Sequence, residues 1–442
     1  MKRLFICVVG LVIAVTAWSR TFNMKELGAD PRGIESCTEL INQTIEKASS
    51  EGGGTIYFPA GVYLTATIHM KSNITLYVES GAVLRFSDRF EDYLPFVKIR
   101  WEGTVMNTLS PLIYAHDAEN LTITGRGTLN GNGFKWWSWE KETRELIKKN
   151  GGKLPALNKL QRMWEEANED LEISDYYKPS LERRMFRPPF IQFYECNNVL
   201  IENVKIVNSP FWTVNPEFCD NVVVTGVTIH NVPSPNTDGI NPESCRNVHI
   251  SDCHISVGDD CITLKSGRDA QARRLGVPCE NITITNCTML SGHGGVVIGS
   301  EMSGSVRKVT ISNCVFDGTD RGIRIKSTRG RGGVVEDIRV SNIIMSNIKR
   351  EAVVLNLKYS EMPVEPMSER TPLFRDISIS GLTAVGVKTP VKIVGLEEAP
   401  VTDIILRDIN VKNAREKCIF ENCERIRLTD VIVNGKEVRL EE

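Results

Sequence analysis

The sequence predicts an all-β protein built as a β-solenoid, in which the chain winds into stacked coils of short strands. Two observations predict this fold. A nine-residue pattern recurs nine times between residues 198 and 433, with a start-to-start spacing of 22 to 39 residues. Within each copy apolar and polar residues alternate with the period of a β-strand, and repeats of this length are typical of solenoids. We expect about ten coils, stacked at about 4.8 Å, with differences in length absorbed by loops on one side.

The repeats share a turn-forming residue at their sixth position, which is Asn, Gly or Asp in every copy. These residue types tolerate the left-handed backbone conformation that a sharp corner needs. The pattern therefore predicts two short strands per copy, separated by a corner. The copies are NVLIENVKI (198–206), NVVVTGVTI (221–229), NVHISDCHI (247–255), NITITNCTM (281–289), KVTISNCVF (308–316), DIRVSNIIM (337–345), DISISGLTA (376–384), DIILRDINV (403–411) and RIRLTDVIV (425–433).

The cysteine residues follow the same register. Eight of the eleven cysteines after residue 19 occupy positions that other repeats fill with apolar residues. We therefore expect small buried core residues, and neither a disulfide framework nor a metal site. The eight are Cys196, Cys219, Cys245, Cys279 and Cys423, two residues before a repeat, and Cys253, Cys287 and Cys314 at its seventh position.

Two segments upstream depart from the repeat. Leu40, Ile41, Ile45 and Ala48 lie on one face of a predicted amphipathic helix, which we expect to cover the open N-terminal end of the solenoid. Residues 134–190 are charged and partly helical in pattern, and are expected to project from one coil as a long insertion. Residues 20–442 are thus predicted to form one domain.

The first 19 residues predict export. Lys2 and Arg3 precede an apolar run of 14 residues, and Ala17-Trp18-Ser19 offers small residues for cleavage. This run is too short for a comfortable membrane span. We expect a protein of the periplasm or the extracellular medium, monomeric and not bound to a membrane. The chain has 53 basic and 55 acidic residues, so its net charge of −2 gives no reason to expect a nucleic acid partner.

Four consecutive coils end their loops in similar segments: NTDGINPE (236–243), GDDCITLK (258–265), GHGGVVIG (292–299) and DRGIRIKS (320–327). When these segments are aligned, Asp238 is level with Asp260, and Asp259 is level with His293. Stacked neighbours lie roughly 5 Å apart. The alignment therefore gathers three carboxylates and a histidine on one face.

Three carboxylates held this closely cannot all ionise freely, so one pKa should be raised while the others stay charged. An acid and a base on either side of a scissile bond is the arrangement that hydrolysis of a glycoside requires. Lys265, Arg324 and Lys326 fall on outward-facing positions of the same strands and suit a substrate that carries carboxylates.

The tripeptides NTD (236–238), GDD (258–260), GHG (292–294) and RIK (324–326) resemble, in that order, the four signatures of the polygalacturonases, glycoside hydrolase family 28. The similarity runs from about residue 24 to the C-terminus. It implies a right-handed parallel β-helix that cleaves α-1,4 bonds between galacturonic acids by single displacement with inversion, without a metal or another cofactor.

The resemblance also implies roles. Asp259 would be the general acid, Asp238 and Asp260 would hold and activate the attacking water, and His293 would orient the surroundings of the acid. For substrate binding, the candidates are Asn236, Lys265, Arg324, Lys326 and Tyr359.

One departure concerns a cysteine. Fungal members pair the cysteine after the DD with one four residues before the GHG histidine; here that position is Met289, so Cys261 is expected to be unpaired.

Two other functions fit the fold. A β-helical polysaccharide lyase would use calcium and a basic side chain, and would yield an unsaturated product. A non-catalytic glycan-binding solenoid would leave the aligned aspartates unexplained. Within the hydrolases, rhamnogalacturonan or xylogalacturonan could replace polygalacturonate. We expect exo action, because a long insertion beside one end of a groove would turn it into a pocket.

Overall fold

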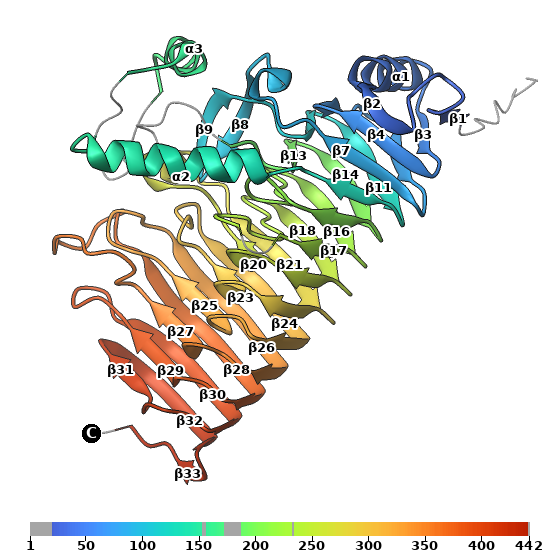
Figure 1. The fold of residues 1–442 in the computed structure, drawn as a ribbon. Helices are drawn as coiled ribbons and strands as arrows, with labels where there is room; N and C mark the ends of the chain where they lie inside the picture. The colour runs from blue at the N-terminus through green and yellow to red at the C-terminus, as the bar shows by residue number, and fades with distance from the viewer. Residues whose placement is uncertain (1–19, 153–155, 172–186, 232–233, 441–442) are drawn as a thin grey trace, which may run out of the picture.

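The computed structural model describes residues 20–152, 156–171, 187–231 and 234–440. The predicted leader, residues 1–19, lies outside them, as do residues 153–155 and 172–186 of the insertion. The chain forms a right-handed parallel β-helix whose coils are stacked from the N-terminus to the C-terminus (Figure 1). This is the predicted fold.

The nine repeats form the body of the largest sheet, and each pairs in parallel with the next in the predicted register. Four earlier strands extend the same ladder, so the solenoid has more coils than the expected ten. The ladder runs through β1 (Arg20–Asn23), β3 (Gly54–Phe58), β6 (Ile74–Val78), β11 (Glu119–Gly125), β14 (Asn197–Glu202), β16 (Asp220–Thr225), β18 (Arg246–Ser251), β21 (Cys279–Thr285), β24 (Val306–Asp317), β26 (Val334–Ser346), β28 (Leu373–Val385), β30 (Val401–Lys412) and β32 (Cys423–Val433).

A second ladder of shorter strands follows the corner within each coil. From β24 onward the two strands of a coil are continuous, so the two ladders merge into one sheet. The second ladder comprises β2 (Arg32–Ser36), β4 (Gly61–Thr65), β7 (Ala82–Phe86), β12 (Thr128–Asn130), β15 (Lys205–Val207), β17 (Thr228–His230), β19 (His254–Ser256) and β22 (Thr288–Ser291).

A separate face carries the strands that follow the aligned acidic loops. Single-residue bridges at Val214 and Ile240 join its two parts, so one ladder runs along the whole face. We call it the third ladder. It contains β5 (Ile68–His69), β10 (Ile113–His116), β13 (Ile191–Tyr194), β20 (Asp260–Leu264), β23 (Gly294–Ile298), β25 (Ile323–Lys326), β27 (Glu351–Asn356), β29 (Thr389–Val394) and β31 (Ile419–Glu421).

Each repeat turns at two corners. The residue at the sixth position has a positive φ in all nine copies, from 51° at Asp408 to 63° at Gly226, as predicted. The first position is also left-handed, for example 53° at Asn198 and 56° at Lys308. The sequence pattern missed this corner because Lys308 and Arg425 occupy it in two repeats, and they are not turn-forming residues.

Apolar side chains of the three ladders meet in one core along the helix axis. The predicted inward residues of the third ladder, such as Ile262, Val296 and Ile323, are at most 1% exposed. All eleven cysteines of the described residues are free thiols, and nine of them are buried. Cys423 is only half-buried because it lies in the last coil of the ladder.

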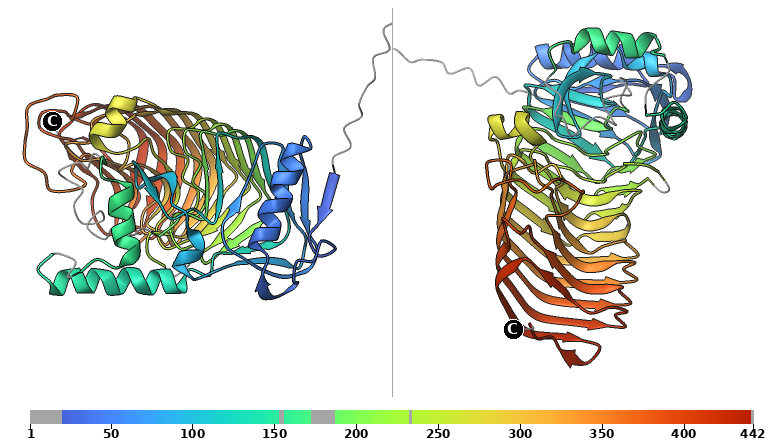
Figure 2. Two further views of the ribbon diagram at one scale, coloured as in Figure 1. Left: turned by 90° about the horizontal axis from the view of Figure 1, so that it is seen from above. Right: turned by 90° about the vertical axis from the view of Figure 1, so that its left-hand side faces the viewer.

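Helix α1 (Thr38–Ser50) covers the N-terminal end of the core, as expected, and buries Ile41, Ile45 and Ala48 against it (Figure 1). The insertion contains α2 (Phe134–Lys149) and α3 (Lys159–Ala167), which lie beside the β-helix in both views of Figure 2. Trp136 anchors α2, because it is fully buried with its ring centroid 4.1 Å from that of Phe90.

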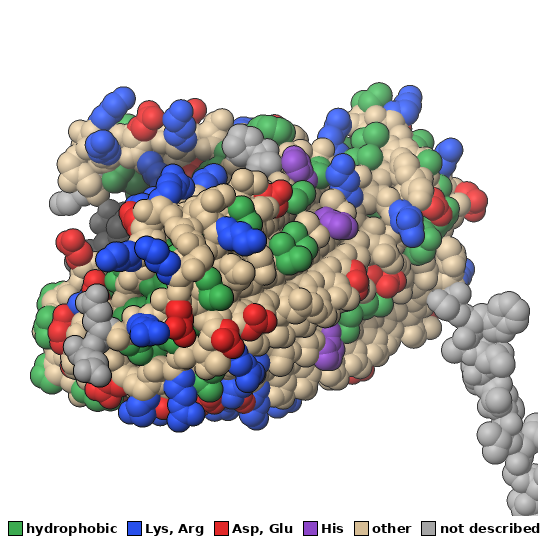
Figure 3. All heavy atoms as spheres, turned by 90° about the horizontal axis from the view of Figure 1, so that it is seen from below, with side chains coloured by type: hydrophobic (Ala, Val, Ile, Leu, Met, Phe, Trp, Pro, Cys, Tyr) green, Lys and Arg blue, Asp and Glu red, His purple; other side chains and the backbone are tan. Residues whose placement is uncertain are grey.

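The remaining elements are short. An antiparallel hairpin of β8 (Val97–Trp101) and β9 (Thr104–Thr108) and helix α5 (Asp269–Leu275) lie near the third ladder, η1 (Phe90–Tyr93) precedes the hairpin, and β33 (Lys436–Glu437) folds back on β32. None of the helices in the described part of the chain is both long and apolar enough to cross a membrane. Acidic and basic side chains are interspersed on the face shown in Figure 3, in keeping with the balanced charge.

Candidate active site

The third ladder places the aligned loops in the predicted register. Ile240 pairs with Ile262, Asp260 with Gly294, and Val297 with Arg324. Asp238 therefore stands level with Asp260 in the adjacent coil. This register brings the aligned loops to one patch of the face.

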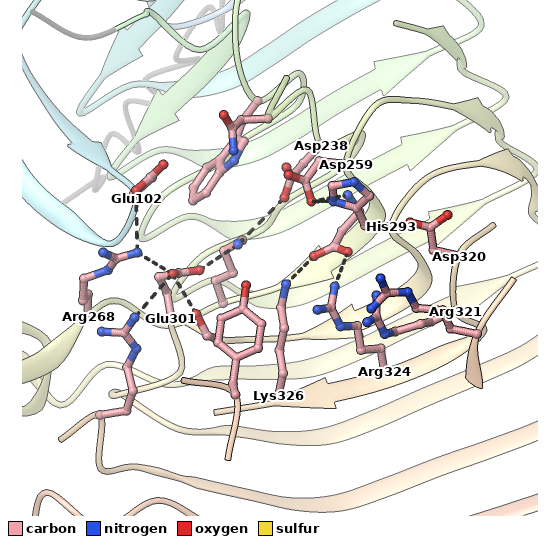
Figure 4. Close-up of a pocket in the computed structure, with 18 residues that line it drawn as sticks. Glu102, Asp238, Asp259, Arg268, His293, Glu301, Asp320, Arg321, Arg324 and Lys326 are labelled. Carbon is pink, nitrogen blue, oxygen red and sulfur yellow. Dashed lines mark hydrogen bonds and ion pairs between the residues drawn. The ribbon is translucent and has the colours of Figure 1, made fainter. Parts of the chain in front are cut away.

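The three aspartates converge on one point. Asp238, Asp259 and Asp260 each offer a carboxylate oxygen, and these oxygens lie within 4.8 Å of one another (Figure 4). Asp238 and Asp260 are almost fully buried, whereas the Asp259 side chain keeps 18% of its surface exposed. Asp259 is thus the carboxyl group of the three that an incoming substrate reaches most readily.

Two cations hold Asp260 in its ionised form. Its two oxygens contact Lys326 Nζ at 2.7 Å and Arg324 Nη1 at 3.2 Å. Burial alone would raise its pKa, but the two cations outweigh burial and hold the pKa at about 2. Asp260 therefore stays negatively charged at neutral pH.

The pKa of Asp238 is shifted in the opposite direction. Burial and the nearby charge of Asp259 raise the pKa of Asp238 well above its ordinary range, even though Lys265 Nζ lies 3.8 Å away. Asn241 Nδ2 donates a 2.9 Å hydrogen bond to it. The expectation that one acid of the group has a raised pKa thus falls on Asp238, while the resemblance gives the acid role to Asp259.

His293 lies against Asp259, as the alignment predicted. Its Nδ1 is 3.1 Å from Asp259 Oδ1, and this hydrogen bond raises the pKa of the imidazole. The side chain of His293 is about half exposed. It therefore connects Asp259 to the mouth of the pocket.

The predicted substrate-binding residues all line this pocket. Arg324 and Lys326 both contact Asp260, so their charge is shared with a protein carboxylate. The guanidinium carbon of Arg324 and the amine of Lys326 lie 5.6 and 5.3 Å from the centre of the Tyr359 ring, which is 44% exposed. Asn236 accepts a 2.8 Å hydrogen bond from Arg187 through Oδ1.

Lys265 is more deeply placed than the alignment suggested. Its amine contacts Glu301 Oε2 at 2.8 Å and lies 4.3 Å from the centre of the Trp212 ring. Burial opposes its charge, but Glu301 and Asp238 together raise the pKa of the amine. Lys265 therefore acts on these two acids more directly than on a ligand in the pocket.

A network around Glu301 escaped the sequence analysis. Glu301 accepts hydrogen bonds from Lys265 and from Arg268 Nη2, the latter at 2.6 Å, and Arg331 Nη2 lies 3.8 Å away. Burial opposes ionisation, but Lys265, Arg268 and Arg331 together hold the pKa of Glu301 well below its usual range. GSEMSG in this coil matches none of the four signatures, so no sequence signal marked Glu301.

The pocket has a volume of about 450 Å³, a size common for small-ligand sites. The wall at one end comes from the β8–β9 hairpin, whose tip residue Glu102 lies 3.6 Å from Arg268 Nη2. Among the described residues, none from 134–190 lines the pocket, which corrects the expectation that the insertion itself closes it. The insertion supports the hairpin instead: Asn168 Oδ1 accepts a hydrogen bond from the backbone nitrogen of Asn107. The two-residue turn EG between alternating strands was an available signal for the hairpin.

The three aspartates are also the group of acids, among the described residues, that could hold a cation. Lys326 and Arg324 occupy both oxygens of Asp260, and Lys265 faces Asp238, so positive charge already surrounds two of the three candidate ligands. This arrangement suits direct acid–base chemistry better than metal binding.

Comparison with known proteins agrees with the site. A sequence model described as glycosyl hydrolases family 28 matches residues 180–430, and one described as rhamnogalacturonase A/epimerase, pectate lyase-like, matches residues 21–148. A probable polygalacturonase from Vitis vinifera is 30% identical over 409 residues, which cover 90% of this chain and 75% of that protein. An exo-poly-alpha-D-galacturonosidase from Dickeya chrysanthemi is 27% identical over 361 residues, covering 78% and 58%.

Among solved structures, a hyperthermoactive exopolygalacturonase from Thermotoga maritima superimposes with a TM-score of 0.83 at 38% identity, covering 94% of this chain and 92% of that one. The tailspike protein of E. coli bacteriophage HK620, at 12% identity and a TM-score of 0.58, covers 93% of this chain and 67% of that one and shares the fold alone. Since the family model spans more than half of the chain, and the Vitis vinifera protein matches most of it, the chain belongs to family 28 of the glycosyl hydrolases.

Proposed function

We propose that the protein hydrolyses α-1,4 bonds between galacturonic acid units of pectin, acting at chain ends. The observation that carries this proposal is the convergence of Asp238, Asp259 and Asp260 in a pocket that also contains Arg324 and Lys326. Acids supply the proton transfers of glycoside hydrolysis, and cations suit a polymer whose every unit bears a carboxylate. The names of the related polygalacturonases support the same substrate.

In the proposed mechanism Asp259 donates its proton to the glycosidic oxygen as the bond to the anomeric carbon breaks. Its greater exposure and its contact with His293 support this role. Asp260 accepts a proton from the attacking water, because its low pKa keeps it ionised. Asp238 holds that water, and the proton that Asp260 has accepted returns to Asp259 through water after each turnover, which restores the starting state.

Single displacement inverts the anomeric carbon. Carboxyl groups of inverting glycosidases are usually about 6.5–9.5 Å apart, and those of retaining enzymes about 5–5.5 Å apart. Here one oxygen of each aspartate lies within 4.8 Å of one oxygen of the other two, and this distance is not the separation of a catalytic carboxyl pair. We infer inversion because salt bridges hold both oxygens of Asp260 away from a nucleophilic role. Proton NMR of the first product decides: an inverted anomer supports this account, and a retained one contradicts it.

The shape of the site supports exo action. Glu102 and the Glu301 network form a wall at one end of the pocket, so a chain that enters from the other end stops there. An exo enzyme releases small terminal products from the start, whereas an endo enzyme first releases mixed oligomers. Rhamnogalacturonan and xylogalacturonan remain outcomes of the substrate test.

The direct test is incubation with de-esterified polygalacturonate, following reducing ends and product size together. We expect reducing ends to accumulate while the polymer remains long, and the Asp259→Asn variant to release almost none. A product that absorbs in the ultraviolet and is lost with chelator would instead indicate a lyase. Binding without any reducing ends would indicate a non-catalytic solenoid.

We further propose that the protein is exported, with residues 1–19 removed, and that it works as a monomeric single domain. Lys2, Arg3 and the apolar run after them support export, and the continuous core of the described coils supports a single domain. N-terminal sequencing of the mature protein tests the first point, and light scattering after size exclusion tests the second. An intact leader or a defined oligomer would contradict them.

A further inference from the structure

We infer that the β8–β9 hairpin closes the substrate groove on its N-terminal side, and that Glu102 at its tip binds a hydroxyl group that only a chain end presents. This inference rests on the proposed hydrolysis of galacturonan. It assigns the exo selectivity to a hairpin and a carboxylate that lie outside the four sequence signatures.

The rows of outward-facing side chains that contain Arg324 and Lys265 continue along the third ladder, past the three aspartates and toward the N-terminal coils. One row passes from Arg324 through Val297, Thr263 and Asn241 to Asn215, Gln192 and Tyr114. The row of Lys265 continues through Glu243, Glu217 and Tyr194. Apart from Val297, these outward positions carry polar side chains, so without a cover they would form an open groove along the face.

The hairpin lies across these rows. The backbone oxygen of Arg100 accepts a 2.9 Å hydrogen bond from Gln192 Nε2, and that of Lys98 accepts a 2.7 Å bond from the Tyr114 hydroxyl. Gln192 and Glu217 are 0% exposed although they face outward from the ladder. Glu217 Oε2 has no hydrogen-bond partner but lies 3.7 Å from Arg100 Nη1 of the hairpin, so the hairpin covers this polar surface. A polymer bound along the face therefore cannot continue past the hairpin.

The hairpin is held firmly. Arg100 is 1% exposed, lies 3.7 Å from both Glu217 and Glu243, and stacks 4.6 Å from the centre of the Phe218 ring. Trp101 stacks on Phe211 with a centroid distance of 4.8 Å. Buried charge pairs and stacked rings of this kind resist local opening. The hairpin thus forms a fixed wall.

The tip of the hairpin docks on the loop that carries Arg268. The backbone oxygen of Gly103 accepts a 3.0 Å hydrogen bond from Arg268 N, and a Cβ atom on Gly103 would lie 2.9 Å from atoms of Arg268. Only glycine fits this approach with φ at 83°. The docking sets Glu102 at the pocket wall beside Arg268, as Figure 4 shows.

A carboxylate at this wall distinguishes a chain end from a chain interior. In an α-1,4-linked galacturonan the 4-oxygen and the anomeric oxygen of internal units are part of glycosidic bonds, so a free hydroxyl at either position exists only at an end. Glu102 can accept a hydrogen bond from such a hydroxyl, while it repels the carboxylate of a further unit. Arg268 and Arg331, on the same wall, suit the carboxylate of the terminal unit itself.

The test compares three trimers: trigalacturonate, a trimer whose non-reducing unit is 4,5-unsaturated and lacks the 4-hydroxyl, and a trimer whose reducing end has been reduced with borohydride. We expect the wild type to discriminate against one of the two altered trimers by about 10- to 100-fold in kcat/KM, the effect of one hydrogen bond to a charged group. That trimer identifies the end that Glu102 binds. In Glu102→Ala the discrimination disappears, and in Glu102→Gln it falls less, because an amide oxygen still accepts a hydrogen bond.

Glu195→Gln is the matched control. Glu195 directly follows Tyr194 on the same face, is about half exposed, and does not line the pocket. This variant should keep the wild-type discrimination. Equal rates of the wild type on all three trimers, or discrimination that persists in Glu102→Ala, would overturn the inference while leaving the hydrolase function intact. Failure of the wild type to cleave unmodified trigalacturonate, or longer galacturonans, would instead overturn the proposed function.

Discussion

Replacing Lys326 with methionine tests whether the cations of the RIK segment serve Asp260 as well as substrate. Lys326 Nζ lies 2.7 Å from Asp260 Oδ2, and Asp260 is 1% exposed. The pKa of this carboxyl is lowered from 3.8 to about 2 against the effect of burial. Nearly two pKa units correspond to about 2 kcal/mol of stabilisation in the ionised state.

The direction in which the stability changes with pH follows from the linkage between protonation and folding. Because the pKa is lower in the folded protein, the stabilisation is present above pH 3.8 and is lost as the pH falls through about 2. Lys326→Met leaves Arg324 in place at 3.2 Å, so part of the effect survives. Leaving a buried charge with fewer partners costs up to about 3–5 kcal/mol. We therefore expect a loss of about 2–4 kcal/mol at pH 7, shrinking as the pH falls below 4.

The assay combines urea unfolding at pH 7 and at low pH with the pH profile of kcat/KM. In the variant the pKa of Asp260 rises, so the acidic limb of the profile should move to higher pH. Lys349→Met is the matched control: Lys349 makes an exposed pair with Asp320 at 2.9 Å, worth about 0–1 kcal/mol. Equal stability of the two variants, or an unmoved acidic limb in Lys326→Met, would refute the reasoning.

Three further results are expected. Asp259→Asn should lower kcat by at least about 100-fold while leaving substrate binding largely intact, since the amide cannot donate a carboxyl proton; unchanged turnover would exclude Asp259 as the acid. The same substitution should lower the pKa of His293 toward its ordinary 6.5, measured by NMR titration, because the hydrogen bond that His293 donates to Asp259 raises it; an unchanged pKa would show that this contact is not formed in solution. Asn313→Ala should destabilise the protein by about 1 kcal/mol more than Asn313→Gly, since φ is 54° there; equal unfolding midpoints in urea would show that the corner carries no strain.

The stacking of the coils was predictable because the repeat encodes it locally. Alternation within each copy and a turn former at the sixth position fix the ladder, and the ladder fixes which distant residues become neighbours. The level placement of Asp238 with Asp260 needed only the alignment of four loops, and the register confirms it. The family resemblance added roles to positions that the register had already brought together.

The closed end of the pocket was not predictable in the same way. Glu102 reaches the site because a hairpin folds back over the third ladder, and Arg100 and Trp101 fix it through contacts with residues more than 100 positions away. No local pattern encodes such packing. The insertion was expected to close the pocket itself, but its described helices buttress the hairpin, with Asn168 bonded to Asn107.

The partners and the ionisation of the charged residues could not be predicted from the sequence either. Lys265 and Lys326 look equivalent in the alignment, yet one contacts Glu301 and the other Asp260. Likewise, the raised pKa falls on Asp238 because of its burial, which the sequence does not reveal. The local repeat determines the position of each residue in the ladder. The burial of its side chain by distant segments determines its pKa.

A crystal structure of the Asp259→Asn variant with trigalacturonate tests the central claim most directly. We expect the glycosidic oxygen within hydrogen-bond distance of residue 259, one sugar carboxylate on Arg324 and Lys326, and a terminal unit against Glu102. A sugar chain bound on another face of the helix, or running across the position of the β8–β9 hairpin, would contradict this account.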